Sequence, residues 1–409
     1  MINLMKIIND LYPLRRDLVS DGYDQALEYI NSIIPLQIHK YPTGTQCWDW
    51  IIPPKWEIRE AYIKDSKGNT IIDINESPLA VSSYSVPVSK TVTKDELLKH
   101  IFTEPNQPDA VPYTFTPYEK KWEFCVPHNS LKQFSDQYYE VLIDSVFEEG
   151  MLKVGEYEIK GKSDNIIVVM AHLDHPFQAN DDLTGVAITI DLAMHLKKRN
   201  NYYTYKFLFV PESIGSIAYL SNNEAFIPKM IGGIFLEKLG NSNDHSIQFS
   251  KKKTSNIDLA ANYILTKASS PYKTGDYGTI LGNDEKIFNS TYVDVPMISI
   301  TRKPYPEMHT SNDNPKIIHK SKLYESAKIV YDVLILNDNN RYIKSMVKGP
   351  ICLSRHGIAM NKDIRYWKLL SYLDGKFTIL ELSFLLKADF YVLKNIMDEF
   401  EVKELVIQL

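Results

Sequence analysis

Histidine and acidic side chains follow each of four apolar runs in this sequence. They are His172, Asp174, Asp181 and Asp182 after VVMA, Glu212 after FLFVP, Glu237 after GIFL, and His309 after MISITRKPYPEM. The chain holds 51 Asp and Glu residues and 10 His residues among 409, so chance seldom places one of them after every such run. The pattern indicates one shared site to which these runs deliver side chains.

The chemistry that suits these side chains is metal-assisted hydrolysis. Imidazole and carboxylate groups are ligands of Zn²⁺ and similar divalent ions, and a catalytic zinc site keeps one position open for water. A carboxylate that lies between two ions can bridge them. A carboxylate beside the ion can take a proton from water, because the ion lowers the pKa of that water to ~7. Glu212 is the best candidate for this base.

Apolar runs that alternate with helical stretches predict the elements that position these side chains. The alternation is typical of a mostly parallel, doubly wound α/β sheet with helices on both faces. Ligand-binding groups gather at the carboxyl ends of the strands in such a sheet. The predicted strands are NIIVVMA (165–171), YKFLFV (205–210), GGIFLE (232–237) and VPMISIT (295–301), and the predicted helices are TGVAITIDLAMHLKKR (184–199) and KLYESAKIVYDVLIL (322–336).

Three regions of the chain differ in composition and in the spacing of their apolar residues. Residues 1–34 have apolar residues at helical spacing, and together with residues 136–349 they predict the α/β domain. Residues 35–135 contain short β-rich pieces separated by Pro, Gly and Asn, with SKGN (66–69) as a hairpin turn, which predicts an inserted β domain. Residues 350–409 predict three short helices with a terminal strand pair, resembling a small winged-helix unit.

The stretch AHLDHPFQANDDLTGVA (171–187) resembles the His-x-Asp and Asn-Asp-Asp-x-x-Gly signature of the M28-type zinc aminopeptidases. The later stretches PESIG, FLEKLG and YPEMHTSND follow in that family's order. With its β insertion and short C-terminal domain, the chain is similar to a predicted aminopeptidase-like group often found beside polysaccharide-biosynthesis genes. The resemblance implies a fold of zinc-exopeptidase type that holds one or two zinc ions.

The resemblance also implies a role for each motif residue. His172 would be a ligand of one metal, Asp174 the carboxylate that orients it, and Asp181 the carboxylate that bridges two metals. His309, in the MHTSND context, would complete the second metal. Glu237 stands where the family generally has an aspartate, and it can still bind a metal because it is only one methylene longer.

The chain departs from the family at VPESIG. The family usually has two successive glutamates before a spacer and a glycine, the first as general base and the second as metal ligand. Counting back from Gly215, Glu212 falls on the base and Ser213 on the ligand. Three outcomes are then open. The site holds one metal, it binds its second metal weakly, or Glu212 serves as a metal ligand and the site loses its general base.

Several of these residues also have an ordinary structural explanation. Asp182 is assigned to the N-terminus of the helix at 184–199, where a carboxylate stabilises the helix by ~0.3–1 kcal/mol. Glu237 can form an ion pair with Lys238. His175 is left out of the ligand set, because neighbouring residues of an extended segment point to opposite sides.

The other candidate site residues also have structural explanations that involve no metal. His172 and Asp174 can form a hydrogen-bonded polar pair at the edge of a core. Glu212 and His309 can lie in solvated loops. We favour the metal site because all four strand ends carry such residues.

Composition limits the classes of function. A content of 44% hydrophobic and 24% charged residues with a net charge of −5 is typical of a soluble globular protein. Three scattered cysteines and the lack of any run of about 18 apolar residues favour a cytoplasmic protein without disulfides or membrane contact. From Pro350 onward, basic and acidic residues balance, which argues against nucleic acid and favours a protein partner for this region.

Two functions from different classes fit these observations. The first is a zinc-dependent aminopeptidase or amidohydrolase that acts on a peptide or an amide-containing small molecule. The second is a binding or regulatory protein with a degraded peptidase site, which the serine at position 213 supports.

Overall fold

The computed structural model describes residues 2–268, 270–359 and 364–409. The chain divides into two compact units. The first consists of Met1–Lys251 and Ser269–Lys328, and the second consists of Lys252–Ala268 and Ile329–Leu409. Every residue to which we assign chemistry lies in the first unit.

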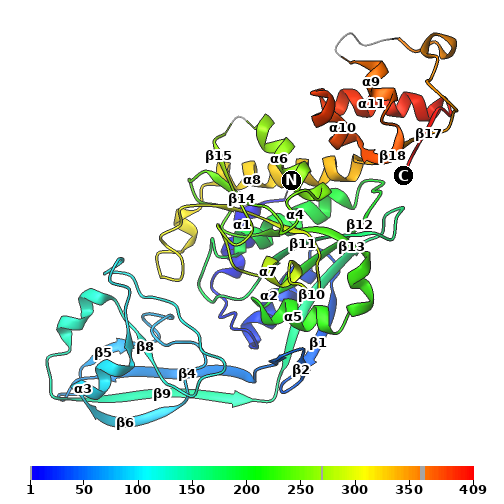
Figure 1. The fold of residues 1–409 in the computed structure, drawn as a ribbon. Coiled ribbons are helices and arrows are strands. Elements are labelled where there is room, and N and C mark those ends of the chain that lie inside the picture. Colours follow the sequence, from blue (N-terminus) through cyan, green and yellow to red (C-terminus); the bar gives the residue numbers. More distant parts are fainter. Residues whose placement is uncertain (1, 269, 360–363) are drawn as a thin grey trace. The chain divides into compact units, whose positions relative to one another are not determined.

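The centre of the first unit is an eight-stranded sheet with the order β1-β10-β12-β11-β13-β16-β14-β15 (Figure 1). The four predicted strands are its four neighbouring middle strands, and they run parallel to one another. They are β11 (Ile166–His172), β12 (Thr204–Val210), β13 (Met230–Leu236) and β16 (Met297–Arg302). The predicted α/β fold is therefore confirmed, and the carboxyl ends of these strands share one edge.

The outer strands make the sheet mixed. β10 pairs antiparallel with β1 and β12, and β14 pairs antiparallel with β16 and parallel with β15. These strands are β1 (Gln37–Pro42), β10 (Met151–Ile159), β14 (His245–Gln248) and β15 (Tyr272–Gly275). Every residue of β11 and β12 is buried, as expected for central strands that are covered on both faces.

Helices cover this sheet. Residues of α5 share a core cluster with Ile166, Val168 and Met170, which are alternate residues of β11. Helix α4 also packs on β11 and on α1, but its described residues contribute nothing to that cluster, as expected for a helix on the other face. The α-helices that lie wholly in this unit, among the described residues, are α1 (Leu4–Leu11), α2 (Asp21–Asn31), α3 (Lys94–Leu97), α4 (Leu183–Leu196), α5 (Ile214–Ser221) and α7 (Glu285–Phe288).

The β-rich region forms a second sheet with the order β5-β4-β9-β6, drawn in colours from blue to blue-green in Figure 1. Its strands are β4 (Lys55–Lys64), β5 (Thr70–Asp73), β6 (Val88–Thr93) and β9 (Tyr138–Glu148). Gly68 has a φ of +84° in the turn that joins β4 to β5, which is the turn predicted at SKGN. β9 lies beyond residue 135, where we expected the insertion to end, and β1 belongs to the large sheet.

Four short strands form two small pairs in the same region, namely β2 (Gln46–Cys47) with β3 (Trp50–Ile51) and β7 (Ile101–Phe102) with β8 (Phe124–Cys125). Trp122 belongs to the core of the four-stranded sheet. Trp56 is fully buried and donates from its indole N–H to the carbonyl of Ser85. These two tryptophans therefore serve packing.

The C-terminal part of the second unit contains a small sheet and, among the described residues, three α-helices. The sheet has the order β18-β17-β19, with β17 (Tyr342–Ser345), β18 (Asp374–Thr378) and β19 (Val406–Gln408). The helices are α9 (Tyr366–Leu370), α10 (Ile379–Leu386) and α11 (Phe390–Val402), and α6 (Asn256–Lys267) belongs to the same unit. The winged-helix assignment remains a prediction.

Other elements complete the description. Helix α8 spans Lys320–Asn339, and short 3-10 helices lie at Leu98–His100, His128–Gln133, Glu224–Lys229, Pro315–Ile317 and Leu353–His356. Within the described part of the chain, no helix combines the length and the apolar character that a bilayer crossing requires.

Candidate metal centre

The five side chains predicted to act on a metal or on water lie at one edge of the large sheet, on strand ends and on the loops that follow them. His172 is the last residue of β11, and Glu237 follows the last residue of β13. Glu212 comes two residues after β12, Asp181 lies between β11 and α4, and His309 lies after β16. Because parallel strands end at the same edge, residues that are far apart in sequence meet there.

Three of these residues form a fully buried group of ligand type. His172 Nε2 lies 3.1 Å from Asp181 Oδ1 and 3.7 Å from Glu237 Oε2. Among the described residues, both ring nitrogens of His172, both carboxylate oxygens of Asp181 and Oε1 of Glu237 have no hydrogen-bond partner. Buried polar atoms normally have partners, so this group fits a bound cation.

Asp181 also faces a second group. His309 Nε2 lies 3.4 Å from Asp181 Oδ2, and His175 Nδ1 lies 3.7 Å from Asp181 Oδ1. The three ligand atoms that His175, Asp181 and His309 offer lie within 4.8 Å of one another. Asp181 is thus shared between two groups, which is the position that a bridging carboxylate needs.

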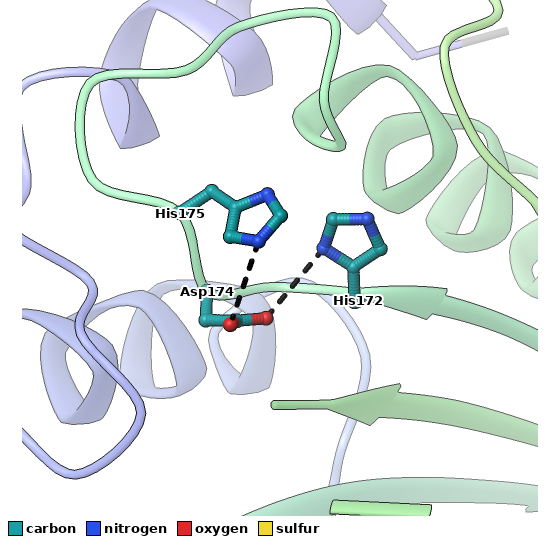
Figure 2. Close-up of side chains that lie close together, drawn as sticks. All are labelled: His172, Asp174 and His175. Atoms are coloured by element: carbon teal, nitrogen blue, oxygen red, sulfur yellow. Dashed lines mark ion pairs between the residues drawn. The ribbon is translucent and has the colours of Figure 1, made fainter. Parts of the chain in front are cut away.

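Asp174 lies beside both histidines of its own loop. Figure 2 shows the rings of His172 and His175 on the same side of the Asp174 carboxylate. Asp174 Oδ1 lies 3.5 Å from His172 Nδ1, and Oδ2 lies 3.9 Å from His175 Nε2. The same carboxylate accepts a hydrogen bond of 2.8 Å from the backbone N–H of Glu212. Asp174 therefore contacts the second ring nitrogen of His172, where it can fix the orientation of that ring.

The arrangement of His175 differs from our expectation. An alternating extended segment would direct its side chain away from His172. His175 has a φ of +74°, which turns the chain, and the two ring centroids lie 4.6 Å apart. Only the conformation of the loop after β11 brings this residue to the site.

Glu212 lies at the mouth of the site. Its Oε2 lies 3.0 Å from His175 Nε2, and its side chain is 19% exposed. Ser213 follows it as the first residue before α5, and its backbone N–H donates to Asp284 Oδ1 at 3.0 Å. Asp182 has the role we assigned to it, because its carboxylate accepts from the N–H of Gly185 at 2.9 Å and caps α4.

Negative charge dominates the centre of the site. Burial lowers the pKa of His172, but Asp174, Asp181 and Glu237 together raise it well above its ordinary value. Burial raises the pKa of Asp181, but Lys238 and the neighbouring imidazoles hold it well below its ordinary value. The carboxylates around His172 therefore stay ionised and stabilise positive charge. This negative charge favours the binding of a cation at the centre of the site.

Lys238 is the protein's own cation at this centre. Its Nζ lies 2.9 Å from Glu237 Oε2 and 3.6 Å from Asp181 Oδ2. The ion pair with Glu237 that we considered as an alternative therefore exists. It accounts for one oxygen of Glu237 and leaves Oε1 without a hydrogen-bond partner among the described residues.

Two buried residues hold the site loops. Asp313 is the last residue of the YPEMHTSND stretch, but no role was predicted for it or for Arg16. Asp313 accepts hydrogen bonds from the backbone N–H groups of Ala179, Asn180 and Asp181 at 3.2, 2.7 and 3.0 Å. Arg16 donates to the carbonyls of residues 173, 175 and 178 at 2.9, 2.7 and 3.1 Å. Both side chains are fully buried and fix the backbone that carries the candidate ligands.

The β insertion also reaches the site. The backbone N–H of Tyr113 donates to the carbonyl of His309 at 2.7 Å. The Tyr113 ring lies 5.7 Å from the His309 ring and 5.3 Å from the His175 ring. The insertion therefore packs against the loop after β16 and supplies part of the apolar wall around both imidazoles.

A cavity of about 400 Å³ opens at the candidate site. Glu212, Glu237 and His309 line it together with Lys238, Lys303 and the loop 278–283. The cavity thus joins the candidate metal ligands, the candidate base and two lysines in one space.

Sequence comparison identifies a family and a related protein that match most of this chain. The family described as "Domain of unknown function (DUF4910)" matches residues 5–340. A protein of Clostridium acetobutylicum, provisionally named a polysaccharide biosynthesis protein with an aminopeptidase-like domain, is 33% identical over 408 residues. The alignment covers 97% of this chain and 94% of that protein.

Solved structures extend the comparison to the fold. A crystal structure from Clostridium acetobutylicum, provisionally named a peptidase, has a TM-score of 0.89 at 32% identity and covers 99% of this chain and 96% of its own. BSAP, a zinc aminopeptidase from Bacillus subtilis, has a TM-score of 0.61 at 14% identity over 81% of this chain and 93% of its own. At 14% identity, the similarity to BSAP concerns the fold alone. The chain therefore belongs to the family described as a domain of unknown function (DUF4910), and its fold is that of the M28-type zinc aminopeptidases.

Proposed function

We propose that this protein is a metal-dependent hydrolase of amide bonds, most similar in action to an aminopeptidase. One observation carries the proposal. His172, Asp181 and Glu237 converge in a buried group, in which both ring nitrogens of His172, both carboxylate oxygens of Asp181 and Oε1 of Glu237 lack hydrogen-bond partners among the described residues. The fold of zinc aminopeptidases supports the same conclusion.

His172, Asp181 and Glu237 would hold one zinc ion, and Asp181 would be shared with a second ion on the side of His309. A bound zinc ion polarises a substrate carbonyl and lowers the pKa of water to ~7. Asp174, next to His172 Nδ1, would keep that ring in the orientation and tautomer that leave Nε2 free as a ligand.

Glu212 would act as the general base. Burial raises the pKa of Glu212, but the hydrogen bond and charge of His175 lower it, and its pKa is about 2. The carboxylate is therefore ionised at neutral pH and lies on the cavity wall. From there it would take a proton from water and pass it to the nitrogen of the leaving amine.

The substrate would be a short peptide or an amide-containing small molecule. A cavity of about 400 Å³ lies at the lower end of the size range of small-molecule sites, ~300–1,000 Å³. We place the protein in the cytoplasm, because Cys47, Cys125 and Cys352 are all free thiols. We assign a protein partner rather than nucleic acid to residues 350–409, and expect no membrane contact.

Metal analysis and a substrate panel test the proposal together. Protein purified without chelator is expected to contain at least one zinc ion per chain. It should hydrolyse aminoacyl or N-acyl amides, lose that activity when the metal is stripped, and regain it with added Zn²⁺. His172→Gln should remove metal and activity together, whereas His195→Gln, in helix α4, should keep both.

The alternative is a peptidase fold that binds or regulates without catalysis. Ser213, in the place where the family resemblance expects a glutamate ligand, is the feature that favours it. Wild-type protein that binds no zinc and hydrolyses no member of the panel would support this alternative and contradict the hydrolase proposal.

Asp313→Asn is expected to weaken zinc binding about 10- to 100-fold, the usual effect of removing a partner that orients ligands. An amide has one acceptor oxygen, so it cannot accept all three backbone N–H groups of residues 179–181. Competition with a chelator of known affinity measures the change. The neighbouring exposed Asn312→Ala is the control, and equal zinc affinities of both variants would contradict this role for Asp313.

A further inference from the structure

The group on the His309 side of Asp181 lacks one of the metal ligands that the family resemblance implies. Asp181 and His309 face each other there. The family resemblance expects a glutamate from the loop after β12 as a further ligand, but the chain has Ser213 at that position. Two protein ligands alone would leave a second ion weakly held, so tight binding needs a third ligand from the surrounding side chains.

His175 offers an unused ligand atom at this place. The residue is only 1% exposed, and its Nδ1 has no hydrogen-bond partner among the described residues. Nδ1 lies 3.7 Å from Asp181 Oδ1, and the ring lies 4.9 Å from the His309 ring. A buried nitrogen that points toward a carboxylate and a second imidazole is placed as a metal ligand would be.

The opposite nitrogen of the same ring has a partner. His175 Nε2 lies 3.0 Å from Glu212 Oε2. If Nε2 donates its proton to this carboxylate, Nδ1 keeps a free lone pair for a metal. Histidines that bind metals usually donate their other N–H to a carboxylate or carbonyl, and this pair follows that arrangement.

We propose that His175 is a ligand of a second divalent ion, together with Asp181 and His309, and replaces the glutamate ligand lost at Ser213. The inference rests on the proposed function, because Asp181 must already hold the first ion with His172. It goes beyond the family resemblance, because the roles that the resemblance implies do not include His175.

The surroundings of His175 keep its ring in place. Arg16 donates to the carbonyl of His175 at 2.7 Å and to the carbonyls on either side of it in the same loop. The rings of Tyr113 and Phe115 lie 5.3 and 6.2 Å from the imidazole. The ring is therefore held at the site before any ion binds, which favours binding.

Lys238 is the competing explanation for the charge balance. Its ammonium lies 3.6 Å from Asp181 Oδ2, the oxygen that also faces His309. A single ion next to His172, with Lys238 as the second positive charge, would leave His175 without a metal. The two arrangements differ in the number of ions per chain.

Metal counting in wild type, His175→Gln and His195→Gln separates the two arrangements. Each protein is stripped of metal, titrated with Zn²⁺ and counted by elemental analysis after desalting, and folding is checked by circular dichroism. Wild type and His195→Gln are expected to bind two ions per chain, and His175→Gln one. Equal numbers in wild type and His175→Gln would overturn the inference, whereas a wild type that binds no zinc would overturn the proposed function as well.

His175→Cys keeps the test decisive if the glutamine variant does not fold. A cysteine at this position still offers a ligand atom, so the variant is expected to bind two Co²⁺ ions. The thiolate-to-cobalt charge-transfer absorption should appear only with the second equivalent. A folded variant that takes up both ions without this absorption would show that residue 175 binds neither.

Discussion

Glu212→Gln is expected to lower kcat by roughly 10²- to 10⁴-fold, the usual contribution of a general base. Glutamine keeps the size of the side chain and can still contact His175, but it cannot accept a proton from water. The carboxylate lies on the cavity wall and outside the group formed by His172, Asp181 and Glu237. Zinc content should therefore stay at the wild-type level, while the rate falls on the best substrate of the panel.

The same change at an exposed position provides the control. Glu149→Gln lies on the surface and is expected to leave kcat unchanged. Equal turnover by wild type and the Glu212 variant would remove the assignment of Glu212 as base. A parallel loss of zinc and activity would instead show that Glu212 helps to hold zinc, either as a ligand, which is one of the alternatives that the sequence left open, or as the partner of His175.

Lys206→Met is expected to destabilise the fold by roughly 3–5 kcal/mol, as removal of one partner of a buried ion pair usually does. Lys206 on β12 and Glu156 on β10 form a salt bridge, and both are almost fully buried. Among the described residues, the variant would leave the Glu156 carboxylate with Tyr219 and His39 as partners, at 2.8 and 3.0 Å. Chemical denaturation at neutral pH measures the change in the free energy of unfolding.

Acid should reduce this destabilisation. Burial raises the pKa of Glu156, but His39 and Lys206 lower it, so that its pKa is about 2 against an ordinary value of 4.5. In the wild type the ionised carboxylate therefore stabilises the fold above pH 4.5, and this stabilisation is lost as the pH falls toward 2. Without Lys206 burial dominates and the pKa of Glu156 rises, so protonation stabilises the variant at low pH.

The difference in unfolding free energy between wild type and Lys206→Met should therefore shrink from pH 7 to pH 4. Lys160→Met is the matched control, because Lys160 pairs with Glu158 on the surface and its side chain is 76% exposed. This control should change stability by less than about 0.5 kcal/mol at either pH. A destabilisation by Lys206→Met that does not depend on pH would point to lost packing rather than to the ion pair.

The sequence by itself determined the central sheet. Uninterrupted apolar runs mark strands that are buried on both faces, and this property is local, so β11, β12, β13 and β16 could be predicted. Because the carboxyl ends of parallel strands share one edge of a sheet, the sequence also predicted that His172, Glu237 and His309 lie close together. The cap at Asp182 was likewise predictable, because it depends only on the residues that follow it.

Tertiary structure alone decided which further residues complete and hold the candidate centre. His175 reaches the site through a backbone turn with positive φ, which a pattern of alternating residues does not encode. Arg16 and Asp313 act by hydrogen bonds to backbone groups 157 and 133 positions away, and any backbone segment offers such groups regardless of its sequence. Local patterns fix which segments form buried strands, whereas contacts between distant loops depend on how those strands are arranged in space.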